Sequence, residues 1–123
     1  MEFDKHRPIY AQVMDHLKEQ MVNGTYQPGE SLPSRREIAR ELGINPNTVQ
    51  RAFAQLEEQG YLTTQNTQSS VVTTDQEKLQ QLRHEQIQQA LDALITTADH
   101  IGLSLNDIQA LLIATYQRRN HDD

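Results

Sequence analysis

The chain has 123 residues, of which 36% are hydrophobic, and a formal net charge of −6. This length allows one small domain, or one domain with an extension. The absence of cysteine excludes disulfides and thiolate metal sites. No signal peptide or long apolar run is present, so we expect a cytoplasmic protein that does not enter a membrane. A small, lean core also favours oligomerisation as an additional source of stability.

The first predicted helix follows a short N-terminal segment, residues 1–7, which we expect to be loosely attached. Pro8 suits the first turn of a helix. Four apolar residues then follow at helical spacing: Ile9, Val13, Leu17 and Met21. Gly24 is expected to end this helix. A turn around Pro28-Gly29 should then lead into a short strand at Ser31-Leu32.

Two short helices joined by a glycine turn are predicted next. Ser34 and Glu37 form a capping box, so a helix should begin just after Ser34. Gly43 can adopt the left-handed conformation that ends a helix. Asn45 is a good N-cap, and Pro46 then takes the first helical position. This layout is typical of a helix-turn-helix, whose second helix offers its N-terminal end to the DNA major groove.

The two helices separate apolar from polar side chains. The apolar ones predict a single buried cluster: Ile38, Leu42, Ile44, Val49, Phe53 and Leu56. The polar ones are left to face outward: Arg35, Arg36, Asn47, Thr48, Gln50 and Arg51. Side chains of these types contact phosphates and base edges, so the pattern favours nucleic acid over an ordinary helical pair.

A β-hairpin is predicted after the second helix ends at Gly60. Residues 61–65 and 69–73 are rich in β-formers and flank a polar tip. A hairpin in this position is the wing of a winged helix-turn-helix. Its tip could reach phosphate through Gln65, Asn66 or Gln68.

Two further helices are predicted to form a C-terminal hairpin. Thr74 and Glu77 make a second capping-box pattern, so a long helix should begin near Asp75 and stop before Gly102. Ser104, three residues before Asp107, gives a similar start to a shorter helix. The fold class is therefore mainly α with a small β-wing. We expect residues 1–74 to form the DNA-binding domain and residues 75–123 a dimerisation hairpin.

The apolar stripe of this hairpin is too long to be covered by one small winged domain. Two copies could pack into a four-helix arrangement, which predicts a homodimer. The residues expected at its interface are Leu79, Leu82, Ile87, Leu91, Leu94, Ala98, Ile101, Ile108, Leu111 and Leu112. The alternative is a monomer whose hairpin folds back on its own DNA-binding domain.

The remaining residues give no sign of catalysis. The five histidines are scattered, and the sequence has no glycine-rich phosphate loop and no nucleophile elbow. We therefore predict neither an enzyme, nor a metal site, nor a cofactor.

Positive charge gathers where DNA contact is predicted. Residues 35–51 hold four arginines against two glutamates, whereas the chain after Thr74 holds four basic residues against eight acidic ones. We expect DNA affinity to depend on salt, with a small slope for a dimer because few phosphates are neutralised.

Residues 32–53 resemble the DNA-binding domain of the GntR family of bacterial transcription regulators. The similarity extends upstream to residues 8–13, Gly24 and Pro28-Gly29, and downstream through residues 56–62. The Asn-Pro-Asn-Thr-Val run at residues 45–49 and the short C-terminal part resemble the YtrA-type subfamily. The resemblance implies the same dimer and suggests neighbouring transporter genes as targets.

The resemblance also implies roles for individual residues. Arg36 matches the arginine of the family's Pro-Ser-x-Arg-Glu motif, which contacts DNA. The full predicted DNA-binding set is Arg35, Arg36, Asn45, Asn47, Thr48, Gln50, Arg51, Gln65 and Asn66. For Asn45 the alternative role is capping alone. For Arg35 and Arg36 the alternative is a solvated side chain or an ion pair with Glu37 or Glu41.

The wing departs from the family pattern. Relatives carry Gly-x-Gly-x-Phe-Val at the tip, whereas residues 67–72 read Thr-Gln-Ser-Ser-Val-Val. Glycine allows a close backbone approach to the minor groove, so we expect weaker or altered wing contacts.

The predicted function is that of a homodimeric repressor on a double-stranded, inverted-repeat DNA operator. A small-molecule effector, if one acts, would bind between helices or across the dimer and change the half-site spacing. One alternative is a winged-helix protein-interaction module without DNA binding, which the acidic charge favours and the exposed arginines oppose. Another is the DNA-binding portion of a longer, aminotransferase-like enzyme, against which the start and the polar end of the chain argue.

Overall fold

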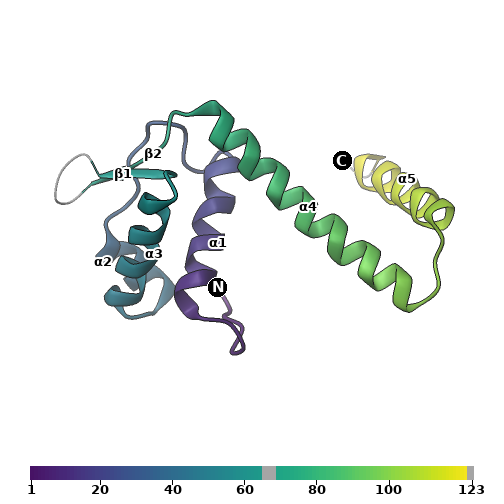
Figure 1. Ribbon diagram of the computed structural model, residues 1–123, viewed down its shortest axis with the longest axis horizontal. Coiled ribbons are helices and arrows are strands. Elements are labelled where there is room, and N and C mark those ends of the chain that lie inside the picture. Colours follow the sequence, from purple (N-terminus) through teal and green to yellow (C-terminus); the bar gives the residue numbers. More distant parts are fainter. Residues whose placement is uncertain (65–68, 122–123) are drawn as a thin grey trace. The chain divides into compact units, whose positions relative to one another are not determined.

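The computed structural model describes residues 1–64 and 69–121 (Figure 1). Within these ranges the elements are α1 (Ile9–Val22), α2 (Arg35–Leu42), α3 (Pro46–Glu58), β1 (Leu62–Thr64), β2 (Ser70–Val72), α4 (Gln76–His100) and α5 (Leu105–His121). This confirms the predicted fold class, a winged helix-turn-helix followed by two helices. The chain divides into two units, Met1–His84 and Glu85–Asp123.

The first seven residues are held against α1, which corrects the expectation of a loosely attached segment. The side chain of Gln12 in α1 is buried, with 6% exposed. Its Oε1 accepts a hydrogen bond from the Asp4 N–H at 2.7 Å, and its Nε2 donates to the carbonyls of Asp4 at 2.7 Å and Arg7 at 3.0 Å. Phe3 packs against the core. A buried amide must find partners, and here the preceding backbone supplies them.

The helix-turn-helix has the predicted caps. Ser34 Oγ accepts from the Glu37 N–H at 3.1 Å, and α2 begins at the next residue, Arg35. Gly43 follows α2 with φ of 68°, the left-handed conformation in which glycine carries no steric cost. Asn45 Oδ1 then accepts from the Asn47 N–H at 2.8 Å, and Pro46 takes the first position of α3.

The core of the first unit lies between α1, α2 and α3, and it includes the first turns of α4. The largest fully buried side chains are Phe53, Leu17, Leu56, Leu79, Leu82, Val13, Val49 and Val72. Leu79 and Leu82 come from α4, so this helix is anchored in the first unit before it continues into the second. The division between the two compact units falls inside α4, at His84 and Glu85.

The wing is a two-stranded antiparallel sheet in which Leu62 pairs with Val72 and Thr64 with Ser70. The predicted strand at Ser31-Leu32 is reduced to a single bridge between Ser31 and Val71. It is supported by a hydrogen bond from the Leu32 N–H to the Ser70 carbonyl at 2.9 Å. The β2 strand is thus held on both edges.

The start of α4 differs by one residue from the prediction. The cap is Asp75, not Thr74, because Asp75 Oδ1 accepts from the Glu77 N–H at 3.0 Å. Asp75 is oriented by its own N–H, which donates to Thr73 Oγ1 at 3.1 Å. Lys78 then reaches back, and its Nζ donates to the carbonyl of Gln59 just after α3 at 2.9 Å.

The second unit contains the rest of α4 and α5, joined at Gly102 with φ of 74°. The predicted cap of α5 is present as two reciprocal hydrogen bonds between Ser104 and Asp107. The Ser104 N–H donates to Asp107 Oδ2 at 3.0 Å, and the Asp107 N–H donates to Ser104 Oγ at 3.2 Å. The hydrogen bonds with Ser104 lower the pKa of Asp107 below its ordinary value, and the bond from the Ser104 backbone has the larger effect.

Candidate nucleic-acid interface

The recognition helix α3 presents a polar face at its N-terminal end. Val49, Ala52, Phe53 and Leu56 are buried on the opposite face, which fixes the rotation of the helix. Asn47, Gln50 and Arg51 are exposed in consequence, and Thr48 is half-buried. Short polar side chains at a helix N-terminus leave backbone N–H groups open to phosphate and can also reach base edges.

Asn45 lies at the same end of α3 and is exposed. Its Oδ1 accepts a hydrogen bond from the Asn47 N–H, so this oxygen caps α3. The cap orders the turn that carries Asn47 and Thr48.

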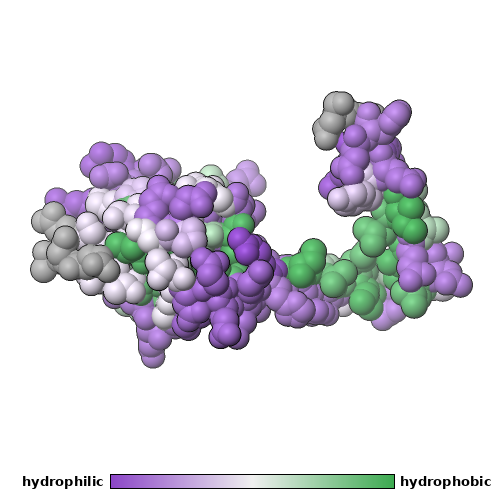
Figure 2. All heavy atoms as spheres, turned by 90° about the horizontal axis from the view of Figure 1, so that it is seen from above, coloured by the Kyte–Doolittle hydropathy of each residue, from purple (hydrophilic) through white to green (hydrophobic). Residues whose placement is uncertain are grey.

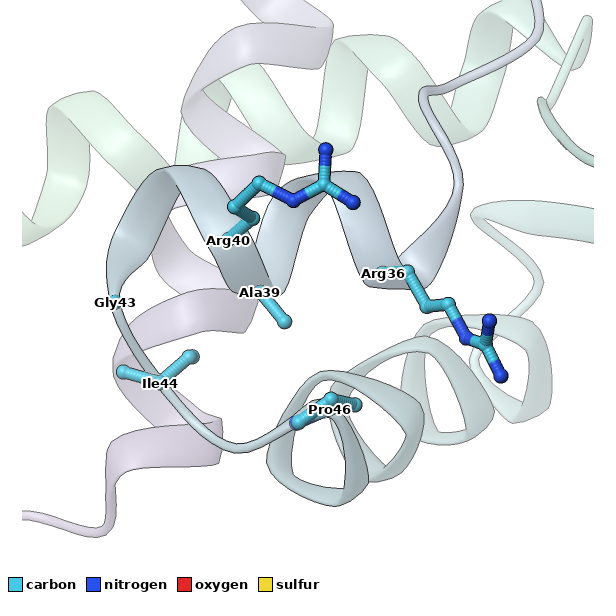
Figure 3. Close-up of a pocket in the computed structure, with 6 residues that line it drawn as sticks. All are labelled: Arg36, Ala39, Arg40, Gly43, Ile44 and Pro46. Carbon is cyan, nitrogen blue, oxygen red and sulfur yellow. The ribbon is translucent and has the colours of Figure 1, made fainter.

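A first surface hollow lies between α2 and the start of α3. It has a volume of about 410 Å³ and is lined by Arg36, Ala39, Arg40, Gly43, Ile44 and Pro46. Figure 3 shows that both arginines extend from α2 and that their guanidinium groups point away from the small apolar side chains. Both arginines are exposed. Two cations at the rim of an apolar hollow suit a phosphate backbone that crosses the helix pair.

A second hollow of about 370 Å³ joins the start of α1 to the start of α3. It is lined by Pro8, Ile9, Tyr10, Asn47, Thr48 and Arg51. The Arg51 guanidinium lies over the Tyr10 ring, 3.8 Å from its centroid, which is a close cation–π contact. The ring restricts the arginine to one region of the surface beside Asn47 and Thr48.

Arg35 does not belong to the outward-facing set, which corrects its predicted place. Its Nη2 lies 3.3 Å from Glu57 Oε1, and only 20% of its side chain is exposed. Its guanidinium also lies over the Phe53 ring, 4.9 Å from the centroid. Arg35 is thus paired, but with Glu57 of α3 and not with Glu37 or Glu41, the partners named in the alternative.

The predicted wing contacts Gln65 and Asn66 lie outside the described residues, as does Gln68. The sequence reasoning omitted two residues that the structure adds to the site, Tyr10 and Arg40. The sequence feature that could have indicated Tyr10 is an aromatic residue in the first turn of a predicted helix. In the structure this residue is only half-buried. Arg40 contributes to the positive charge of residues 35–51, and its spacing of one helical turn from Arg36 places it on the same face.

Comparisons with known proteins show which family the chain belongs to. The family model described as "Bacterial regulatory proteins, gntR family" matches residues 9–72, more than half of the chain. The chain belongs to the GntR family. Proteins of this family are DNA-binding transcription regulators rather than enzymes, and this chain is one of them.

Individual relatives place this GntR regulator more closely. It is 32% identical to the transcriptional repressor YtrA of Bacillus subtilis, over 82% of this chain and 78% of that protein. Among solved structures, a GntR family transcriptional regulator from Listeria monocytogenes has a TM-score of 0.83 at 33% identity, over 91% of this chain and 98% of that one. The DNA-binding domain of AraR, solved in complex with an operator, has a TM-score of 0.53 at 26% identity, over 59% of this chain and 86% of that one. The chain is therefore a GntR regulator of the YtrA-like type.

The predicted interface residues of this GntR regulator, which all follow the wing in the sequence, fall into two groups by burial. Leu79 and Leu82 are 2% and 1% exposed in the core of the first unit, so they leave the predicted dimer surface. Ala98 is also buried, and Ile108 is half-buried. An amphipathic stripe does not say which partner covers it, and here the first turns of α4 are covered by the chain's own winged domain.

The other apolar residues of these helices are uncovered. Figure 2 shows hydrophobic residues spread over the visible face of α4 and α5. The large side chains at least 39% exposed here are Ile87, Leu91, Leu94, Ile95, Ile101, Leu105, Leu111, Leu112, Ile113 and Tyr116. Apolar surface of this extent on one small unit marks an interaction surface.

The described residues also bear on metal sites and on membrane spans. Among residues 1–64 and 69–121, no group of three or more histidine or acidic side chains is placed to hold a metal ion. None of the described helices has the length and hydropathy that a membrane crossing requires.

Proposed function

We propose that this GntR regulator is a homodimeric repressor that binds an inverted-repeat operator. The observation that carries the proposal is the polar N-terminal end of α3, flanked by two hollows with exposed arginines at their rims. Supporting it, YtrA is named a repressor and the AraR domain is solved on an operator. Such a protein acts in the bacterial cytoplasm, where its operator lies.

The proposed division of labour follows from side-chain chemistry. Asn47, Thr48 and Gln50 are placed to read base edges, because amides and hydroxyls can both donate and accept in the major groove. Arg36 and Arg40 bind phosphate beside them. Arg51, held over Tyr10, contacts either phosphate or a guanine edge.

The proposed dimer forms through the uncovered residues of α4 and α5. Two winged domains so linked would meet half-sites about one helical turn of DNA apart. The acidic helical segment would add little to phosphate attraction, so the arginines of the winged domain would set the register.

The test is footprinting on the intergenic DNA that flanks the gene for this chain. We expect two protected half-sites related by inverted symmetry. Arg51→Ala should cost about 1–3 kcal/mol of operator binding if Arg51 reads a base. Arg83→Ala is the matched control, since Arg83 is an exposed arginine that belongs to α4 and lines neither hollow.

Failure of the folded wild-type protein to bind any of this DNA would favour the alternative function, a protein-interaction module. The net charge of −6 is the observation that favours that alternative. Protection of a single asymmetric site would retain DNA binding but contradict the inverted repeat.

A further inference from the structure

A single carboxylate, that of Glu57 in the last turn of α3, connects α3 to three other elements. Its Oε1 lies 3.3 Å from Arg35 Nη2 of α2. The hydroxyl of Ser70 in β2 donates to the same oxygen at 3.4 Å, and the hydroxyl of Thr64 in β1 donates to it as well. Glu57 is thus the common acceptor of α2 and both wing strands.

The two hydroxyl donors occupy matching positions on the wing. Thr64 ends β1 and Ser70 begins β2, and they pair directly across the sheet. A contact to both fixes the end of β1 against the start of β2. Leu62 and Val72 anchor the opposite ends of the strands in the core, where they are 2% and 1% exposed, and the Glu57 contact adds a link to α3 at Thr64 and Ser70.

Arg35 is held in this cluster by more than charge. Its guanidinium lies over Phe53, and its Nε is buried without a hydrogen-bond partner among the described residues. Turned inward in this way, the arginine supports the wing and does not face the groove as Arg36 does. Because both partners are largely covered, with 20% and 31% of their side chains exposed, the pair is more than a solvated surface contact.

We propose that Glu57 is a positioning residue of the DNA-binding surface. It sets the wing against the recognition helix and commits Arg35 to that support instead of to a phosphate. The inference rests on the proposed function, since it concerns how the same surface meets DNA.

The chain offers a matched control in the neighbouring residue, Glu58, which is exposed. Glu57→Gln and Glu58→Gln remove the same negative charge from the same turn of α3, so their general electrostatic effects on DNA binding are equal. We expect E57Q to bind the operator about 2- to 30-fold more weakly than E58Q, the range for residues that act on a site through others. Affinity for non-specific DNA should be the same in both variants.

A second pair of variants tests the wing without touching a charge. Thr64→Val removes one hydroxyl donor to Glu57, whereas Thr63→Val changes the exposed neighbour on the same strand. We expect T64V to lose operator affinity relative to T63V. Circular dichroism and thermal unfolding confirm that each variant is folded at the assay temperature, so the comparison holds even if E57Q proves unstable.

Salt titration tests the role assigned to Arg35. Arg36→Met should make the dependence of affinity on salt shallower by about 0.9 for each phosphate that the protein no longer neutralises. Arg35→Met, which keeps an apolar chain over Phe53, should leave the slope unchanged. An equal loss of slope in R35M and R36M, or equal operator binding by E57Q and E58Q, overturns the inference. If the wild-type protein binds no DNA at all, the proposed function itself fails instead.

Discussion

Replacing Ile87 and Leu91 with alanine should separate the proposed dimer while leaving the winged domain folded. The two side chains lie one turn apart on α4 and are 56% and 39% exposed in the single chain. Burying a whole isoleucine or leucine side chain is worth about 1.5–3 kcal/mol. Scaled by these exposed fractions and counted in both copies, the double substitution removes about 3–6 kcal/mol from association. The dimer Kd should therefore rise by about 10²- to 10⁴-fold.

Sedimentation velocity over a dilution series measures this change. Alanine favours a helix more than isoleucine does and at least as much as leucine, so α4 should keep its helical content. The control is Glu85→Ala with Gln89→Ala, two exposed polar residues with the same one-turn spacing on the opposite face of α4. A wild-type protein that stays monomeric at micromolar concentration would refute the reasoning. So would a double variant that associates as tightly as the control.

Three further predictions concern single residues. Tyr10→Leu removes the ring beneath Arg51, so operator affinity measured by fluorescence anisotropy should fall about 2- to 5-fold; unchanged affinity would mean that the ring does not position Arg51. Gln12→Ala leaves the backbone groups of residues 4 and 7 without their partner, so the free energy of unfolding should fall by about 1–3 kcal/mol in urea; no loss would mean that water replaces the amide. The lowered pKa of Asp107 stabilises the cap of α5 above the pKa of an unfolded aspartate, near 3.8, and this contribution is lost as the pH falls through the lowered value. The midpoint temperature of thermal unfolding should therefore fall more steeply from neutral to acidic pH for the wild type than for Asp107→Asn. Parallel pH profiles of the two proteins would contradict this.

The local features of the fold could be predicted because they depend on neighbours in the sequence. Ser34, Asn45 and Ser104 each cap a helix through an N–H two or three residues ahead, so composition and spacing were sufficient. The start of α4 was misplaced by one residue because Thr74 and Asp75 are both good caps. The hydrogen bonds that the Glu77 and Lys78 N–H groups donate to Asp75 Oδ1 distinguish them.

The features that could not be predicted depend on distant partners. Arg35 and Glu57 are 22 residues apart, and nothing local distinguishes Arg35 from its outward-facing neighbour Arg36. The covering of Leu79 by the winged domain is likewise tertiary. Residues 1–7 looked unattached because their anchor is the side chain of Gln12, a residue that sequence patterns assign to the surface.

The placement of Arg35 bears on how an acidic chain can be selective for DNA. With Arg35 paired to Glu57, the arginines of residues 35–51 that make no salt bridge among the described residues are Arg36, Arg40 and Arg51. In the proposed dimer, these three cations of each copy would neutralise about six phosphates, which corresponds to a salt slope of about −5. Non-specific affinity, which depends on that neutralisation, is thereby kept low. Under the proposed function, discrimination rests on the base edges offered to Asn47, Thr48 and Gln50 of α3, because phosphate contacts carry no direct sequence information.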